Sequence, residues 1–128
     1  MNKQIILTAA IYGALAVITG AFGAHALKSK LEPSQLEVWH TAVQYQFYHV
    51  LAILFLSTLN PMNNNMLEWS YYLFTFGVLL FCGSLYLLAV RQVLGWNWLR
   101  FLGPITPLGG LFFIAGWIAL GLGVLKKP

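Results

Sequence analysis

The chain has 128 residues, of which 59% are hydrophobic and only 8% are charged. Because globular domains carry about 25% charged residues, this composition excludes a water-soluble core. The net charge of +4 comes from a few scattered basic side chains, which form no patch able to follow a phosphate backbone. We therefore expect one membrane domain over residues 1–128 and no nucleic-acid partner.

Four runs without a charged residue are long enough to cross a bilayer, which takes about 20 apolar residues in a helix. They cover residues 5–24, 41–59, 69–90 and 101–125. The fold class that they predict is all-α, an integral membrane four-helix antiparallel transmembrane bundle, with spans at about residues 4–26, 35–59, 67–91 and 104–126. An even number of spans places both termini on one side of the membrane, here called side B. Side A then holds residues 25–40 and 91–100.

The first span ends in Ala24-His25-Ala26, a pattern that also fits a signal-peptide cleavage site. Its apolar run is long for a signal core and contains several glycines, so we expect it to be kept as a helix. Small residues recur every four positions in the first and fourth spans and predict close helix contacts. They are Ala16, Gly20 and Ala24, and Ala115, Ala119 and Gly123.

The second helix is expected to start before the membrane, because Ser34-x-x-Glu37 after Pro33 has the form of a capping box. Asn60-Pro61 and the following asparagines predict its end.

Polar side chains crowd the side-A half of this helix, and helical phase sorts them into two faces. Tyr45, Gln46 and His49 share one face, and His40, Gln44 and Tyr48 share another. His49 lies about 13 Å beyond His40 along the axis, well inside the membrane. The two histidines point to opposite sides of the helix, so we expect no metal site here. The helix has to satisfy polar groups in two directions.

Polar residues of the other spans fall at the same level, and Pro104 and Pro107 each remove a backbone donor near Thr106. These groups either form hydrogen bonds that hold the helices together or line a polar pocket open to side A. The candidate pocket residues are His25, Tyr45, Gln46, His49, Ser84, Tyr86 and Thr106. We expect His49 to face the interior and to meet Ser84 or Tyr86 and the backbone near residues 103–106.

The remaining unusual side chains have ordinary structural interpretations. Trp39, Trp69, Trp96 and Trp98 lie at span ends, where amphipathic rings settle at headgroup level. Cys82 is the sole cysteine and is interpreted as a small apolar filler.

Four ordered motifs together resemble one family. They are Gly20-Ala-Phe-Gly-Ala-His25-Ala-Leu27, Thr41-Ala-Val-Gln-Tyr45-Gln46-x-x-His49-x-Leu-Ala52, Phe81-x-Gly83-Ser84-Leu-Tyr86, and Thr106-Pro-Leu-Gly-Gly110 with Gly116-Trp117. By these motifs the chain resembles the domain of unknown function 423 family. Its members are small inner-membrane proteins similar to the animal transmembrane protein 256. The resemblance covers nearly the whole chain. It implies four helices, a bacterial inner-membrane or mitochondrial setting and no established activity. Family members tend to end in a more basic tail than Lys126-Lys127-Pro128, and that tail implies cytoplasmic termini.

Several functions fit these features. The favoured one is a small, non-enzymatic accessory or lipid- or small-molecule-binding membrane protein with a polar pocket in one leaflet. Its partners would be membrane lipid and, as further options, copies of itself or a larger membrane complex. A small oligomeric transporter or channel is the alternative, although no acidic residue lies within a span. A haem or redox protein using His49 as a ligand is less favoured, since a second deep histidine is missing.

An enzyme is not favoured either, because no carboxylate orients a histidine beside Ser84 for nucleophilic catalysis. No catalytic residue and no cofactor is identified.

Overall fold

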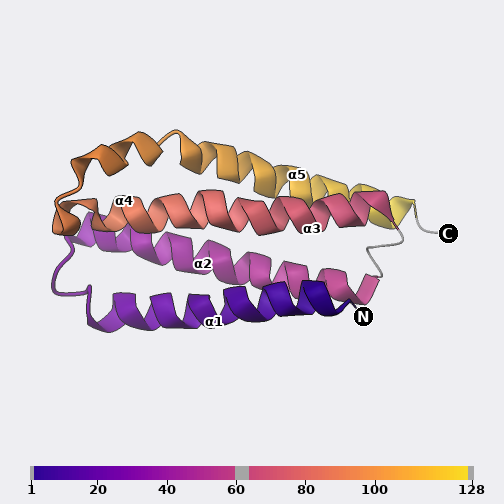
Figure 1. The fold of residues 1–128 in the computed structure, drawn as a ribbon, viewed down its shortest axis with the longest axis horizontal. Helices are drawn as coiled ribbons and strands as arrows, with labels where there is room; N and C mark the ends of the chain where they lie inside the picture. The colour runs from indigo at the N-terminus through magenta and orange to yellow at the C-terminus, as the bar shows by residue number, and fades with distance from the viewer. Residues whose placement is uncertain (1, 60–63, 127–128) are drawn as a thin grey trace.

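A computed structural model of the chain describes residues 2–59 and 64–126, which form four long helices and no strand (Figure 1). The first is α1 (Lys3–His25). The second is α2 (Pro33–Leu56), extended by the 3-10 turn η1 (Ser57–Leu59). The third joins α3 (Asn65–Gly77), a π-helical segment η3 (Val78–Cys82) and α4 (Gly83–Leu94), and the fourth joins the 3-10 segment η4 (Asn97–Leu102) and α5 (Ile105–Leu125). The all-α prediction is confirmed.

Each of the four helices is long and apolar enough to cross a membrane, at 23, 27, 30 and 29 residues. The start of α1 and the end of α5 lie at one end of the bundle, with the connection between α1 and α2 at the other (Figure 1). This arrangement matches the predicted division into side B and side A.

The helix ends follow local chemistry with one departure from the prediction. The Asn2 side chain accepts from the backbone N–H of Ile5 at 3.2 Å, and Gly95 ends α4 with φ of 71°. The predicted capping box is wrong, because α2 begins at Pro33 after Glu32, with no side-chain cap. Proline fixes the helical φ at the first position, so the helix starts before Ser34 is reached. The predicted stop at Asn60-Pro61 lies outside the described residues.

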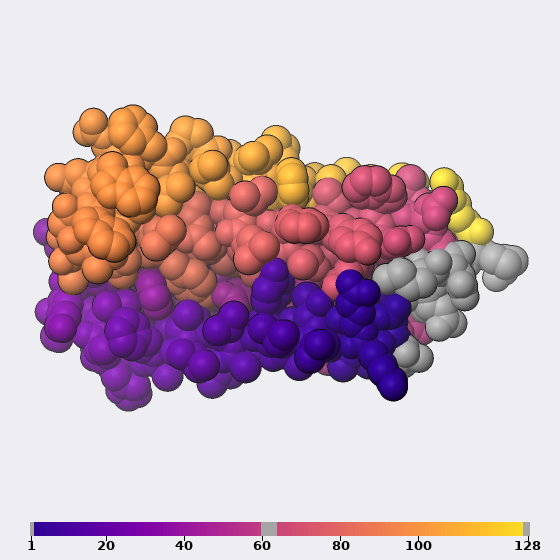
Figure 2. All heavy atoms as spheres, viewed as in Figure 1, coloured from indigo at the N-terminus to yellow at the C-terminus, as the bar shows by residue number. Residues whose placement is uncertain are grey.

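The helices pack in chain order across the bundle: α1 contacts α2, α2 contacts the α3–α4 helix, and α3 contacts α5. Since α1 and the α3–α4 helix both run from side B to side A, they are parallel, and hydrogen bonds made by side chains of α1 join them. Figure 2 shows the face of the bundle on which the atoms of α1 border those of α3 and α4.

Glycines spaced seven residues apart set the contact between α5 and the third helix. A Cβ added at Gly109, Gly116 or Gly123 would lie within 3.0 Å of the third helix. The residues that it would meet, Phe81, Phe74 and Leu67, also recur every seven residues. Ser70 and Asn64 donate to the carbonyls of Gly116 and Gly123 at 2.8 and 3.0 Å. The contact stripe therefore runs through Gly109, Gly116 and Gly123, and the predicted Ala115 is exposed instead.

The four tryptophans predicted at span ends divide into two kinds. Trp69, Trp96 and Trp98 are exposed, as expected of interface residues. Trp39 departs from that prediction, because it is buried and its Nε1 donates to the Thr19 carbonyl at 2.8 Å. The ring fits against Gly23, where an added Cβ would lie 2.5 Å from the indole. Trp39 therefore fixes α2 on α1.

Candidate functional site

Gln46 lies at the centre of the polar contacts between the helices. Its side chain is 3% exposed, and both ends of the amide are used. The Nε2 atom donates to the Tyr12 carbonyl of α1 at 2.8 Å, and the Oε1 atom accepts from the Tyr86 hydroxyl of α4 at 2.6 Å. One amide therefore joins three helices, which in hydrocarbon avoids the cost of an unpaired polar group.

Two tyrosines extend this network along the seam between α1 and the third helix. The Tyr86 hydroxyl lies 3.0 Å from the Thr19 hydroxyl, and the Tyr86 ring meets Trp39 edge-on at 4.7 Å between centroids. The Tyr12 hydroxyl donates to the Thr75 carbonyl at 2.9 Å. Closer to side B, the hydroxyls of Thr8 and Tyr71 are 2.6 Å apart. These contacts bridge two helices whose backbones are not packed together.

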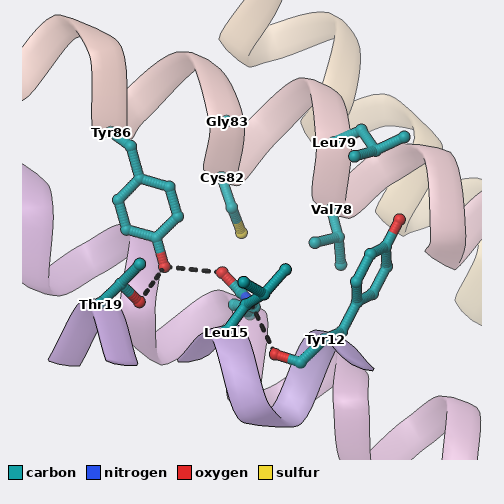
Figure 3. Close-up of a pocket in the computed structure, with 9 residues that line it drawn as sticks. Tyr12, Leu15, Thr19, Val78, Leu79, Cys82, Gly83 and Tyr86 are labelled. Atoms are coloured by element: carbon teal, nitrogen blue, oxygen red, sulfur yellow. Dashed lines mark hydrogen bonds between the residues drawn. The ribbon is translucent and has the colours of Figure 1, made fainter. Parts of the chain in front are cut away.

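A cleft of about 230 Å³ lies between the two bridging tyrosines (Figure 3). It is lined by Tyr12, Leu15, Thr19, Gln46, Val78, Leu79, Cys82, Gly83 and Tyr86. Gln46 and Cys82 are buried, whereas Leu15 and Leu79 are 46% and 55% exposed. The cleft is therefore closed on the α2 side and open toward the surroundings of the bundle. Its lining is almost wholly apolar, because the polar atoms are used in the network.

The third helix is widened where it forms the cleft wall. Val78–Cys82 is a π-helical segment, and the N–H of Gly83 reaches back five residues to the Val78 carbonyl. Single π turns inside α-helices are frequent at functional sites. A Cβ added at Gly83 would meet no atom within 4 Å, so this glycine borders open space.

His49 forms a separate site between α2, α3 and α5. Its ring is 4% exposed and stacks on Phe113 at 3.6 Å between centroids and 9° between planes. The Trp117 Nε1 donates to its Nε2 at 3.1 Å, and its Nδ1 lies 2.7 Å from the Tyr45 carbonyl. An indole only donates, so Nε2 is the acceptor and Nδ1 carries the hydrogen that Tyr45 accepts. Ligation of haem iron by Nε2 would require breaking the Trp117 bond.

Ser84 and Thr106 form a third polar contact, between α4 and the first turn of α5. Their hydroxyls are 2.6 Å apart, and Ser84 donates to the Phe81 carbonyl at 3.0 Å. Since the one hydroxyl hydrogen of Ser84 is used there, Thr106 is the donor to Ser84. Pro104 is the N-cap of α5 and Pro107 lies in its first turn, where helical N–H groups have no carbonyl partner in any case.

The seven candidate residues are thus placed in separate groups. Gln46 and Tyr86 share the cleft network, Tyr45 accepts from His49, and Ser84 pairs with Thr106. His25 is exposed at the end of α1. The expected contact of His49 with Ser84, Tyr86 or residues 103–106 is wrong, because the imidazole is directed to the middle of α5, where Trp117 supplies the donor.

Four residues of these sites were not predicted from the sequence: Tyr12, Thr19 and Cys82 of the cleft, and Trp117 beside His49. Tyr12 and Thr19 carried a signal, since they are polar groups seven residues apart within the apolar first span. Cys82 and Trp117 carried none that separates them from apolar filler and from a lipid-facing aromatic residue. In the part of the chain that the structure describes, no three His, Cys, Asp or Glu side chains could hold a metal ion together.

Comparison with known proteins places the chain in a family. A family model described as "Protein of unknown function (DUF423)" matches residues 19–110. A UPF0382 membrane protein of Staphylococcus saprophyticus is 41% identical over 124 residues, which cover 97% of this chain and 98% of the relative. The UPF0382 membrane protein YwdK of Bacillus subtilis is 40% identical over 126 residues, with coverage of 97% and 98%. No solved structure gives a significant match. The chain is a small multi-pass membrane protein that belongs to the DUF423 family.

Proposed function

We propose that this protein is a non-enzymatic membrane protein that holds part of the hydrocarbon chain of a membrane lipid in the cleft between α1 and the third helix. The observation that carries the proposal is the combination of an exposed apolar rim, at Leu15 and Leu79, with a buried floor at Gln46. An occupant can enter from the surrounding lipid without any rearrangement of the polar network.

The chemistry of the lining favours an apolar occupant. Each polar atom of the Gln46 amide already has a partner inside the bundle, Nε2 in the Tyr12 carbonyl and Oε1 in the Tyr86 hydroxyl. A volume of about 230 Å³ is below the roughly 300 Å³ at which whole small-molecule sites begin. It suits a segment of an acyl or isoprenoid chain whose remainder lies in the bilayer.

The network would hold this space open. Tyr86 and Tyr12 lie at opposite ends of the cleft (Figure 3). Tyr86 bridges to Thr19, and Tyr12 bridges to the Thr75 carbonyl. Both rings span the gap between α1 and the third helix, which limits how closely these helices approach. Under this proposal the polar residues act as spacers around the hydrocarbon chain of the lipid.

The test is to fill the cleft from Gly83. In the Gly83→Leu variant the new side chain enters open space, because a Cβ there has no neighbour within 4 Å. The matched control is Gly121→Leu, since a Cβ at Gly121 also has no neighbour within 4 Å and this residue lies on α5, away from the cleft. Both variants and the wild type would be purified in mild detergent, and retained lipid counted by native mass spectrometry.

We expect wild type and Gly121→Leu to retain lipid and Gly83→Leu to lose most of it, with neither variant melting at a lower temperature than the wild type. Equal retention by all three proteins would refute the proposal. Photo-crosslinking of a diazirine-labelled acyl chain to Leu15 or Leu79 gives an independent check, and labelling confined to other faces would also refute it.

We place the protein in the inner, or plasma, membrane with its termini in the cytoplasm. The relatives with the names given above come from bacteria and are called membrane proteins. The distribution of basic residues supports no orientation by itself, with four on side A and three on side B, so the direction rests on the family tail. A reporter active only outside the cytoplasm, fused after Pro128, should stay inactive, and a strong signal would reverse the orientation.

A further inference from the structure

The outward face of α2 carries polar side chains for which the bundle provides no partner. Gln44 and Tyr48 are exposed, the latter by 55%, and neither polar group takes part in a hydrogen bond among residues 2–59 and 64–126. They point away from the core side of α2, which carries Gln46 and His49. The inward polar groups are satisfied within the chain, whereas the outward groups are not.

These two residues lie at membrane depth. Gln44 is about 10 Å, and Tyr48 about 16 Å, beyond the charged Glu37 along the helix. Tyr48 is next to His49, which contacts Phe113 and Trp117 in the middle of α5. An amide that faces hydrocarbon without a hydrogen bond costs free energy, so this face favours a partner with both a donor and an acceptor.

We propose that the partner is a second copy of this chain, bound α2 to α2. A carboxamide is self-complementary, since its N–H₂ group and its oxygen can pair with the same groups of an identical side chain. Two copies inserted in the same direction are related by a two-fold axis along the membrane normal, which makes their α2 helices parallel and brings identical residues together at the axis. The two Gln44 amides then bond to each other.

The rest of the face continues the same stripe. Gln44, Tyr48, Leu51 and Phe55 follow at steps of four, three and four, the spacing of a left-handed helix pair. Leu51 and Phe55 are 62% and 57% exposed. Below the polar pair the contact is therefore apolar, and a single polar layer fixes its register. The cleft remains open in this dimer, because Gln46 forms its floor from the opposite side of α2.

The experiment is disulfide cross-linking in native membranes. Single substitutions Tyr48→Cys, Leu51→Cys and Phe55→Cys place a thiol on the proposed stripe, and Leu54→Cys places one on another exposed face of the same helix. The native Cys82 is buried, so the wild type gives the background. We expect an oxidant to produce a covalent dimer at the three stripe positions and little at Leu54. Equal cross-linking at all four positions, or none on the stripe, would overturn the proposal.

The amide pair is tested separately in the Tyr48→Cys background. Gln44→Leu should lower the rate of cross-linking by about five- to tenfold, if two amide hydrogen bonds of ordinary strength in a membrane are lost. Gln92→Leu removes an exposed amide near the end of α4 and should leave the rate unchanged. A Gln44→Leu variant that cross-links as fast as the control would rule out this pairing.

Discussion

Replacing Gly109 by alanine tests whether the spacing of α5 and the third helix depends on direct backbone contact. The new Cβ would lie 2.4 Å from the Phe81 nitrogen, 2.7 Å from its Cα and 2.8 Å from its Cβ. Ordinary van der Waals contact begins at 3.4 Å, so the helices have to separate locally by about 1 Å. These atoms belong to the main chain and to the first side-chain carbon, and no rotamer change can move them.

The size of the effect follows from two opposing terms. Overpacking of a tight interior costs about 1–3 kcal/mol, and a clash with backbone belongs at the upper end of that range. Alanine gains up to about 1 kcal/mol over glycine in a helix. We therefore expect Gly109→Ala to destabilise the fold by about 2 kcal/mol. The same change at Gly83 or Gly121 meets open space and should stabilise it by about 0.5–1 kcal/mol.

The assay is equilibrium unfolding in mixed micelles with increasing SDS, followed by tryptophan fluorescence. The decisive result is the difference in sign between Gly109→Ala and its two controls, since all three substitutions add the same methyl group. If Gly109→Ala is as stable as the wild type, the close approach at Phe81 is incorrect. If all three variants are destabilised alike, the effect comes from something other than the clash.

Three further substitutions are tested with the same unfolding assay. Gln46→Leu should lower the free energy of unfolding by about 1 kcal/mol, because it removes two interhelical hydrogen bonds of about 0.6 kcal/mol each. Combined with Tyr86→Phe, it should show a coupling energy of about 0.6 kcal/mol, the strength of the one bond that the two residues share. Strict additivity would mean that the pair does not interact. Trp117→Phe should cost about 1 kcal/mol, because the His49 Nε2 loses its donor, and an unchanged stability would show that the imidazole is satisfied in another way. Asn64→Ala should cost about 1.5 kcal/mol, because Asn64 caps α3 through the N–H groups of Met66 and Leu67 and also donates to the Gly123 carbonyl. Amide exchange at Met66 and Leu67 should rise while that in α1 stays unchanged.

The cleft was predicted only in part, since Gln46 and Tyr86 are the two residues of its lining that were among the seven candidates. Helical phase placed Tyr45, Gln46 and His49 on one face of the second helix. Gln46 and His49 are buried, whereas Tyr45 is 38% exposed. The donor for His49 is Trp117, which is 68 residues away in sequence. A periodic pattern within one helix contains no information on which residue of another helix stands opposite, so the sequence assigned His49 to the wrong neighbours.

What the sequence by itself determined is the number of spans and their alternation along the chain, because charged side chains are excluded from hydrocarbon and the charge-free runs are long enough to cross it. The tertiary structure decided which face of each helix is inside. In water an apolar stripe marks the core, but lipid chains are as apolar as leucine, so the lipid-facing and inward-facing sides of a membrane helix look alike in hydropathy. Trp39 is buried although it resembles an interface residue, and Leu79 is exposed although it resembles core. The rotation of each helix is fixed by close approach at glycines and by hydrogen bonds between helices, and both depend on contacts between distant parts of the chain.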